Sequence, residues 1–295
     1  MRGGDLVTRG AVEIRPARDT ALQNQMCFYL GTHAAGWLWD PAADFPLFVS
    51  HRRLARHKTL RPATHGWALD SGGFTELSTY GAWQTGPREY ARAVARYDEE
   101  IGRLEWAAPQ DWMCEPFMLA RTGLTVAGHQ QRTVASFLTL RDLWTAESDA
   151  ECPFMPVLQG WRLADYEACS GMYEAAGIRL EDYPVVGIGS VCRRQAGGEI
   201  AEIVRAFSPR LALHGFGVKL QGLRLSGHLL ESADSMAWSY AARRADPLPG
   251  HAHKNCANCL DYARQWRDRL LARISGAGGD GWQESLELDW TGEAA

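Results

Sequence analysis

The chain alternates short apolar runs with segments whose apolar positions repeat at helical spacing. Each apolar run ends in a polar or glycine-rich turn before the next helical segment begins. Strand-like runs cover residues 26–33, 45–51, 66–70, 104–112, 153–161, 183–191, 210–218 and 232–244, the last being a short strand end that turns into helix. Helix-like segments cover residues 87–104, 125–144, 163–176, 198–207 and 259–274.

Repeated strand, turn and helix units predict a parallel sheet covered by helices. So many units in one chain favour an α/β fold of the closed (β/α)8 TIM-like barrel type. The competing doubly wound sheet would place a Gly-x-Gly-x-x-Gly turn near the start of the chain. The related stretch here, "GIGSVCRR", has Gly-x-Gly alone and comes late. The pattern therefore favours the barrel.

A length of 295 residues suits one large domain with short additions. We expect a flexible N-terminus over residues 1–25 and the catalytic barrel over residues 26–250. A small zinc-binding knot and a terminal helix follow over residues 251–275. The remainder, residues 276–295, begins with "GAGGDG", is acidic, and is expected to be disordered.

The composition is that of an ordinary soluble enzyme, with 46% hydrophobic and 22% charged residues. No apolar run approaches the roughly 20 residues that a membrane helix needs. The N-terminal segment lacks the apolar core of a signal peptide. Seven cysteines, an odd number and mostly scattered, do not resemble a disulfide framework. We therefore expect a cytoplasmic protein that does not enter a membrane.

The formal net charge of −4 is unevenly distributed. The segment 276–295 holds five acidic residues and no lysine or arginine, whereas residues 45–69 hold no acidic residue and several basic ones. Such basic side chains either neutralise phosphates or form a solvated arginine-rich face, and charge alone does not decide between the two. If they bind a nucleic-acid backbone, the candidates are Arg52, Arg53, Arg56, Lys58, Arg193, Arg194, Arg243 and Arg244.

Three aspartates and a glutamine fall at predicted strand ends, where a barrel of this type places its chemistry: Asp70, Asp111, Asp234 and Gln159. An aspartate can attack C1′ of a sugar and displace its base, while a second carboxylate handles the proton. A third carboxylate and an amide can recognise a purine edge, and glycines leave room for a flat ring. Each residue alone also fits a turn, a helix cap or a strand exit. Their joint placement favours a shared site.

The stretch "LDSGGF" at residues 69–74 resembles the Asp-Ser-Gly-Gly motif of the tRNA-guanine transglycosylases. The stretches "APQDWMCEP", "VLQGW", "VVGIGSV", "LHGFGV" and "SADSMAWS" follow in the order of that family's later motifs, and the resemblance spans residues 30–266. The nearest branch is the shorter one that puts 7-deazapurines into DNA. The tRNA enzymes have Asp-Cys and a later Pro-Thr-Arg where this chain has "SADSMAWSYAARR".

This resemblance implies roles for individual residues. Asp234 corresponds to the nucleophile and Asp70 to the second carboxylate, which serves as general base or substrate anchor. The implied base-binding residues are Ser71, Gly72, Asp111, Gln159, Gly187, Ile188, Gly189 and His214.

The stretch "HAHKNCANC" offers His251, His253, Cys256 and Cys259 within nine residues. Four nitrogen or sulfur ligands at this spacing can form a tetrahedral zinc site; the alternative is a Cys-x-x-Cys without metal beside two solvent histidines. The tRNA-guanine transglycosylases carry a structural zinc at Cys-x-Cys-x-x-Cys and a later histidine. The resemblance therefore implies a structural zinc ion here, with different ligands at the same spacing.

The leading hypothesis is a base-exchanging transglycosylase that takes a free 7-deazaguanine-type base and acts on DNA or, as the less favoured substrate, on tRNA. The target base would have to leave the stack for an aspartate to reach its C1′ atom. In a second hypothesis, water intercepts the same intermediate and the protein is a DNA glycosylase that removes a modified base. A non-catalytic barrel that binds nucleic acid or a partner is a third, and a small-molecule nucleoside enzyme is a fourth.

Overall fold

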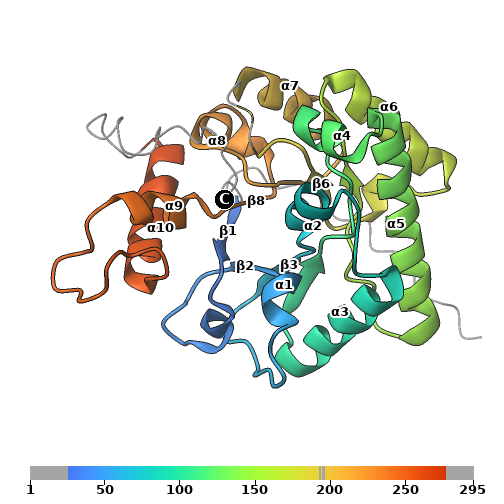
Figure 1. Cartoon of the computed structure of the whole chain (residues 1–295). Coiled ribbons are helices and arrows are strands. Elements are labelled where there is room, and N and C mark those ends of the chain that lie inside the picture. Colours follow the sequence, from blue (N-terminus) through green and yellow to red (C-terminus); the bar gives the residue numbers. More distant parts are fainter. Residues whose placement is uncertain (1–25, 193, 195–196, 277–295) are drawn as a thin grey trace, which may run out of the picture.

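A computed structural model describes residues 26–192, 194 and 197–276. Eight strands form one sheet in which every pairing is parallel (Figure 1). Their order is β4-β3-β2-β1-β8-β7-β6-β5. The strands are β1 (Cys27–Thr32), β2 (Leu47–Ser50), β3 (Trp67–Asp70), β4 (Leu104–Ala107), β5 (Val157–Leu158), β6 (Val186–Ile188), β7 (Leu213–Gly215) and β8 (Ser232–Ser235).

The two ends of this order, β4 and β5, meet through a parallel bridge between Ala107 and Phe154. The amide of Ala107 donates to the Pro153 carbonyl at 2.8 Å, and the amide of Met155 donates to the Ala107 carbonyl at 3.2 Å. These bonds close the sheet into a ring, so the predicted (β/α)8 barrel is confirmed. Each predicted strand-like run contains one of the eight strands.

The long helices surround the ring, and their positions agree with the predicted segments: α3 (Pro87–Ile101), α5 (Val126–Glu147), α6 (Leu163–Ala175), α7 (Gly197–Phe207) and α10 (Leu260–Ile274). The shorter helices are α1 (His51–Leu54), α2 (Gly73–Tyr80), α4 (Pro116–Thr122), α8 (Leu220–Ser226) and α9 (Ala237–Arg244), with 3-10 turns η1 (Ala35–Trp39), η2 (Leu180–Asp182) and η3 (Gly227–Leu229). The first two connections carry only η1 and α1, so the helical layer is thinnest there.

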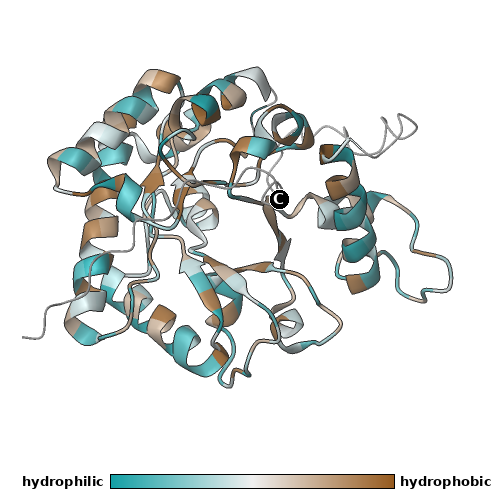
Figure 2. Cartoon of the chain, turned by 180° about the vertical axis from the view of Figure 1, so that it is seen from behind, coloured by the Kyte–Doolittle hydropathy of each residue, from teal (hydrophilic) through white to brown (hydrophobic). Residues whose placement is uncertain are grey.

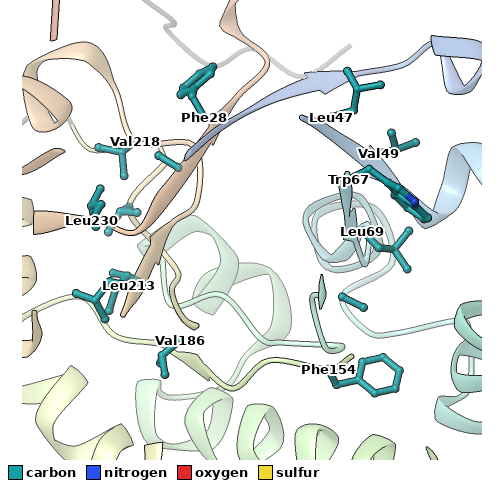
Figure 3. Packing of buried hydrophobic residues seen from close by; sticks show 14 of the residues in the cluster. Phe28, Leu47, Val49, Trp67, Leu69, Phe154, Val186, Leu213, Val218 and Leu230 are labelled. Atoms are coloured by element: carbon teal, nitrogen blue, oxygen red, sulfur yellow. The ribbon is translucent and has the colours of Figure 1, made fainter. Parts of the chain in front are cut away.

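Alternation along each strand separates two layers of core. The side chains on one face of each strand pack between the strands and the helices. Figure 3 shows such residues round the ring, among them Phe28, Leu47 and Trp67. The side chains on the opposite face fill the interior of the ring: Tyr29, Phe48, Ala68, Trp106, Met155, Val157 and Val185. Because side chains two residues apart on a strand share a face, Asp70 follows Ala68 to the interior and Gln159 follows Val157. The polar strand ends are thereby directed to the inside of the barrel.

The terminal helix α10 packs on the barrel beside α9, on one side of the molecule in Figure 1. Its residues Ala263, Trp266 and Leu270 are buried in the main core, and the Trp266 ring lies 6.3 Å from that of Phe28. The predicted flexible N-terminus over residues 1–25 and the predicted acidic tail lie outside the described residues, apart from Gly276. The division of the chain into barrel and zinc knot stays a prediction.

The outer helices mix hydrophilic and hydrophobic positions, whereas the strands at the centre are mainly hydrophobic (Figure 2). In α3 the buried apolar residues Tyr90, Val94, Tyr97 and Ile101 recur at helical spacing. Within the described ranges, no helix combines the length and the apolar character needed to cross a membrane.

Candidate active site at the carboxyl ends of the strands

A cavity of about 1190 Å³ opens at the carboxyl ends of the strands. Residues at or just after the end of every strand contribute to its wall, from Thr32 at the end of β1 to Asp234 on β8. Acidic, amide and basic side chains all line it, together with the rings of Phe48 and Phe216. This end of a (β/α)8 barrel is where catalytic residues gather in characterised enzymes.

Asp70 ends β3 and is followed by a tight turn. Its Oδ1 atom accepts a hydrogen bond from the Gly72 amide at 3.0 Å. Gly72 has φ of 82°, and a Cβ there would lie 2.8 Å from Cγ of Arg52. The turn therefore requires glycine for its backbone conformation and for the close approach of Arg52.

Burial raises the pKa of the Asp70 carboxyl, and the charge on Asp234 adds to this rise, while the Gly72 amide opposes it. The two carboxylates line the same cavity, although they come from β3 and β8, on opposite sides of β1 and β2 in the sheet order. A raised pKa suits a carboxyl group that carries a proton to or from a substrate.

Asp234 lies on β8, is buried, and lines the same cavity. Its Oδ1 atom accepts a hydrogen bond from the Gly217 amide at 2.9 Å. The Nε2 atom of His214 lies 3.3 Å from the same oxygen. The carboxylate is therefore held through one of its two oxygens.

A chain of hydrogen bonds fixes the amide of Gln159. The Cys114 amide donates to Ser190 Oγ at 2.6 Å, and the Ser190 hydroxyl donates to Gln159 Oε1 at 2.5 Å. Gln159 Nε2 then donates to Asp111 Oδ2 at 2.5 Å. Ser190 adopts a left-handed backbone, with φ of 58°, at the position that makes this contact. The network orients one N–H group of Gln159 toward Asp111.

Burial is also the main reason why the pKa of Asp111 is raised to about 7. The hydrogen bond from Gln159 lowers this pKa, and the charge of Asp70 raises it. At neutral pH the Asp111 carboxyl is thus close to its midpoint of ionisation. It can accept hydrogen bonds from a purine edge when ionised or donate one when protonated.

Gly187 on β6 and Gly189 just after it do not leave open space for a flat ring. A Cβ at Gly189 would lie 2.2 Å from Gln159 Nε2, and a Cβ at Gly187 would lie 2.7 Å from Cε2 of Phe216. The space above both glycines is therefore filled by side chains of the protein. Because these two glycines lack a Cβ, the side chains of Gln159 and Phe216 can lie directly against the backbone.

The predicted base-binding residues divide into two groups. Ser71, Asp111, Gln159 and Gly189 line the cavity beside Asp70 and Asp234. The other four, Gly72, Gly187, Ile188 and His214, are not among its lining residues. The Ile188 side chain belongs to the core between strands and helices, and the His214 side chain is fully buried inside the ring. All assigned roles stay predictions.

The predicted backbone-binding residues also divide. Arg52, Arg53, Arg56 and Arg194 line the cavity, whereas Lys58, Arg243 and Arg244 do not, and Arg193 lies outside the described residues. Burial, followed by the charges of Arg53 and Arg243, lowers the pKa of His33 to about 4. The Arg244 guanidinium lies 3.5 Å from the centre of the Tyr240 ring, which does line the cavity.

Arg194 differs from the other arginines because only 5% of it is exposed. It forms an ion pair with Glu199, and its guanidinium lies 4.6 Å from the centre of the Trp161 ring. This position on the inner wall is not that of a surface phosphate contact.

Several residues that line the cavity were not predicted from the sequence, among them Lys219, Arg224, Met113 and Phe216. Lys219 and Arg224 come from the segment after β7 and add positive charge to the wall, three strands along the sheet order from Arg52 and Arg53, which follow β2. Their position directly after the predicted strand end at "LHGFGV" was a usable signal.

The four predicted metal ligands come together. One ligand atom from each of His251, His253, Cys256 and Cys259 lies within 4.8 Å of all the others. His253 Nε2 is 3.0 Å from Cys256 Sγ, and His251 Nδ1 is 3.5 Å from Cys259 Sγ. Nitrogen and sulfur ligands of one tetrahedral zinc ion would lie about 3.5 Å apart.

The carboxylate of Asp261 lies next to His251, with Oδ2 at 3.7 Å from the ring nitrogen Nε2. Such a partner commonly orients a ligating histidine. The donor set and its spacing therefore fit a metal ion.

Fold and cavity together define a (β/α)8-barrel protein whose carboxylates converge on one cavity at the carboxyl ends of the strands. The chain belongs to the DpdA family (DeoxyPurine in DNA protein A), whose model matches residues 24–288. The family description agrees with the DNA-modifying branch that the sequence motifs indicated.

Among the solved structures that match this chain are two proteins of low sequence identity. A putative fructose-1,6-biphosphate aldolase from Coccidioides immitis is 10% identical, with a TM-score of 0.48, over 85% of this chain and 91% of that one. A mandelate oxidase variant is 12% identical, with a TM-score of 0.44, over 85% of this chain and 73% of that one. No curated protein matches the sequence.

Proposed function

We propose that this protein is a base-exchanging transglycosylase that replaces a purine, guanine by preference, with a free 7-deazaguanine in DNA. The observation that carries the proposal is the shared cavity of Asp70 and Asp234, which come from distant segments of the chain. Membership of the DpdA family supports DNA as the substrate.

Asp234 is the proposed nucleophile. The Gly217 amide holds its Oδ1 atom at 2.9 Å, so Oδ2 is the oxygen left to attack C1′ of the deoxyribose. The new C1′–O bond forms as the bond from C1′ to the base nitrogen breaks, and the electron pair leaves with the base. Attack by the incoming base on C1′ then releases the Asp234 carboxylate and completes the exchange.

Asp70 is the proposed acid and base. Because its pKa is raised, the carboxyl can hold the proton that the departing base takes up. The resulting carboxylate then accepts the proton that the incoming base loses as it bonds to C1′. The overall exchange is therefore balanced in protons.

Asp111 and Gln159 are the proposed recognition pair. The ionised Asp111 carboxylate accepts hydrogen bonds from ring and amino N–H groups of a guanine-like edge, and the Gln159 amide keeps one N–H free to donate to the base carbonyl. The aromatic rings of Phe48 and Phe216 add apolar wall to the same cavity.

A flipped nucleotide would bring its phosphates to the rim of the cavity. Arg52, Arg53, Arg56, Lys219 and Arg224 line this region and supply positive charge on both sides of it.

Zinc is the metal we propose for the cluster of His251, His253, Cys256 and Cys259, because a two-histidine, two-cysteine donor set suits a closed tetrahedral zinc site. Its role would be structural, since four protein ligands leave no position for a substrate. The cluster lies in the segment between α9 and α10 and would pin this segment to the start of α10.

The test is incubation of the purified protein with duplex DNA and labelled 7-cyano-7-deazaguanine. We expect label in the DNA with wild type, and none with Asp234→Asn or Asp70→Asn. Asp182→Asn, in η2 in the connection before β6, is the matched control and should retain full incorporation. Abasic sites without incorporation would contradict exchange and indicate a glycosylase, and no reaction on any DNA would contradict both.

A further inference from the structure

The side chain of His214 lies inside the barrel, directly beneath the cavity. It projects from β7 and has no exposed surface. Four aromatic rings surround the imidazole, with centroid distances of 6.1, 6.0, 4.5 and 4.6 Å to Tyr29, Phe48, Trp106 and Phe216. An apolar side chain would suit such surroundings, so the presence of an imidazole calls for an explanation.

The two ring nitrogens of His214 face two polar residues of the neighbouring strand β8. Nδ1 lies 2.9 Å from Ser232 Oγ, at hydrogen-bond distance. Nε2 lies 3.3 Å from Asp234 Oδ1, but the contact is too poorly aligned to count as a hydrogen bond. Nε2 is therefore a buried polar atom that has no hydrogen-bond partner among the described residues, and the nearest candidate is the proposed nucleophile.

The contact between Nε2 and Asp234 selects one tautomer of the imidazole. If Nε2 carried a lone pair, that lone pair would face a carboxylate oxygen and repel it. If Nε2 carries the proton, Nδ1 is free to accept a hydrogen bond from the Ser232 hydroxyl. Ser232 therefore favours the arrangement in which an N–H group faces Asp234.

We propose that His214 is a positioning residue for Asp234. This inference rests on the proposed function, in which Asp234 is the nucleophile. When DNA occupies the cavity, Nε2–H donates to Oδ1 of Asp234 and acts with the Gly217 amide on the same oxygen. Hydrogen bonds at catalytic groups are often long in the free protein and tighten in the complex. Two donors on Oδ1 direct Oδ2 to the sugar.

Three substitutions at His214 separate this role from simple packing. His214→Gln can place its Nε2 amide at the reach of the imidazole Nε2, whereas the shorter His214→Asn reaches only the position of Nδ1. His214→Leu fills the space and donates nothing. The measurement is the rate at which a covalent adduct forms between protein and DNA, together with the affinity for DNA and the melting temperature.

We expect His214→Leu and His214→Asn to form the adduct about 10- to 100-fold more slowly than wild type, with unchanged DNA affinity. His214→Gln should recover most of the rate. A melting temperature of His214→Leu at or above that of wild type would show that the slower rate is not a folding defect. Adduct formation by His214→Leu at the wild-type rate, or no difference between His214→Gln and His214→Asn, would overturn the proposal.

A second readout needs no substrate and so separates this inference from the proposed function. In protein labelled with ¹⁵N-histidine, the chemical shifts report which ring nitrogen of His214 carries the proton. We expect the proton on Nε2 in wild type and a changed Nε2 shift in Asp234→Ala. A proton on Nδ1 with a bare Nε2 would overturn the inference even if base exchange were established.

Discussion

Replacing Gly189 by alanine tests how the base pocket is built. The backbone at residue 189 does not have a positive φ, so alanine can adopt it without strain. The new Cβ, however, would lie 2.2 Å from Gln159 Nε2 and 2.6 Å from its Cδ. Since Cβ contacts this short do not occur, the amide of Gln159 has to move by about 1 Å.

This shift removes the hydrogen bond from Gln159 Nε2 to Asp111, which is 2.5 Å long in the structure. A hydrogen bond to a charged group contributes about 1.5–3 kcal/mol, and a displacement of about 1 Å at a substrate-positioning group can cost roughly 100-fold in rate. The same loss should raise the pKa of Asp111 above its value of about 7, because the Gln159 hydrogen bond lowers it. We therefore expect Gly189→Ala to slow base incorporation by about 10- to 100-fold and to move its pH profile upward.

The assay is the rate of label incorporation into duplex DNA across pH 6 to 9, with the melting temperature as a check on folding. Gly171→Ala is the matched control, because Gly171 is exposed in α6 and a Cβ there meets no atom within 4 Å. It should retain full activity. Wild-type rate and pH profile in Gly189→Ala, confirmed as folded, would refute the view that this glycine exists to seat Gln159.

The remaining predictions concern proton, metal and phosphate. The pKa of Asp111 in the folded protein is raised to about 7, so the stability that its protonated form gives at pH 4 is lost as the pH rises through 7. The stability of Asp111→Asn relative to wild type should therefore increase between pH 4 and 8, by up to about 4 kcal/mol. A difference in melting temperature that is the same at all pH values would refute this. Cys256→Ser should lose bound zinc and several degrees of melting temperature, as should wild type treated with a chelator. Cys152→Ser, which is far from the cluster in sequence, should keep its metal. Elemental analysis that finds no zinc in wild type would contradict the assignment. Arg53→Gln should weaken binding to all DNA sequences alike and reduce the slope of log affinity against log salt concentration by about 0.9. The control Arg179→Gln changes an exposed residue beside η2 and should alter neither the affinity nor the slope. An unchanged salt slope in Arg53→Gln would exclude a phosphate contact.

The alternation of strand and helix signals was sufficient to predict the barrel, because both periodicities are local properties of the sequence. Placement at strand ends was also sufficient to bring Asp70, Asp111, Gln159 and Asp234 to one cavity, since parallel strands of a barrel end on the same side. The short helices α2 and α4 were not predicted, because seven or eight residues carry too little periodicity to be recognised.

Other features of the site depend on contacts between distant residues. Gly187 and Gly189 were expected to admit a flat ring, but Phe216 and Gln159 fill the space above them. The side chain of Ile188 faces the helices, as the alternation along β6 could have indicated. The position of His214 beside Asp234 required the register between β7 and β8, in which His214 pairs with Ser232. Sequence patterns do not contain that register.

As the proposed nucleophile, Asp234 forms a covalent bond with the sugar of DNA during base exchange. The most direct measurement is mass spectrometry of peptides from protein that has been quenched during reaction with duplex DNA. We expect a deoxyribosyl–DNA adduct on the peptide that contains Asp234, absent in Asp234→Asn. An adduct on the peptide that contains Asp70, or exchange of bases without any protein adduct, would contradict it.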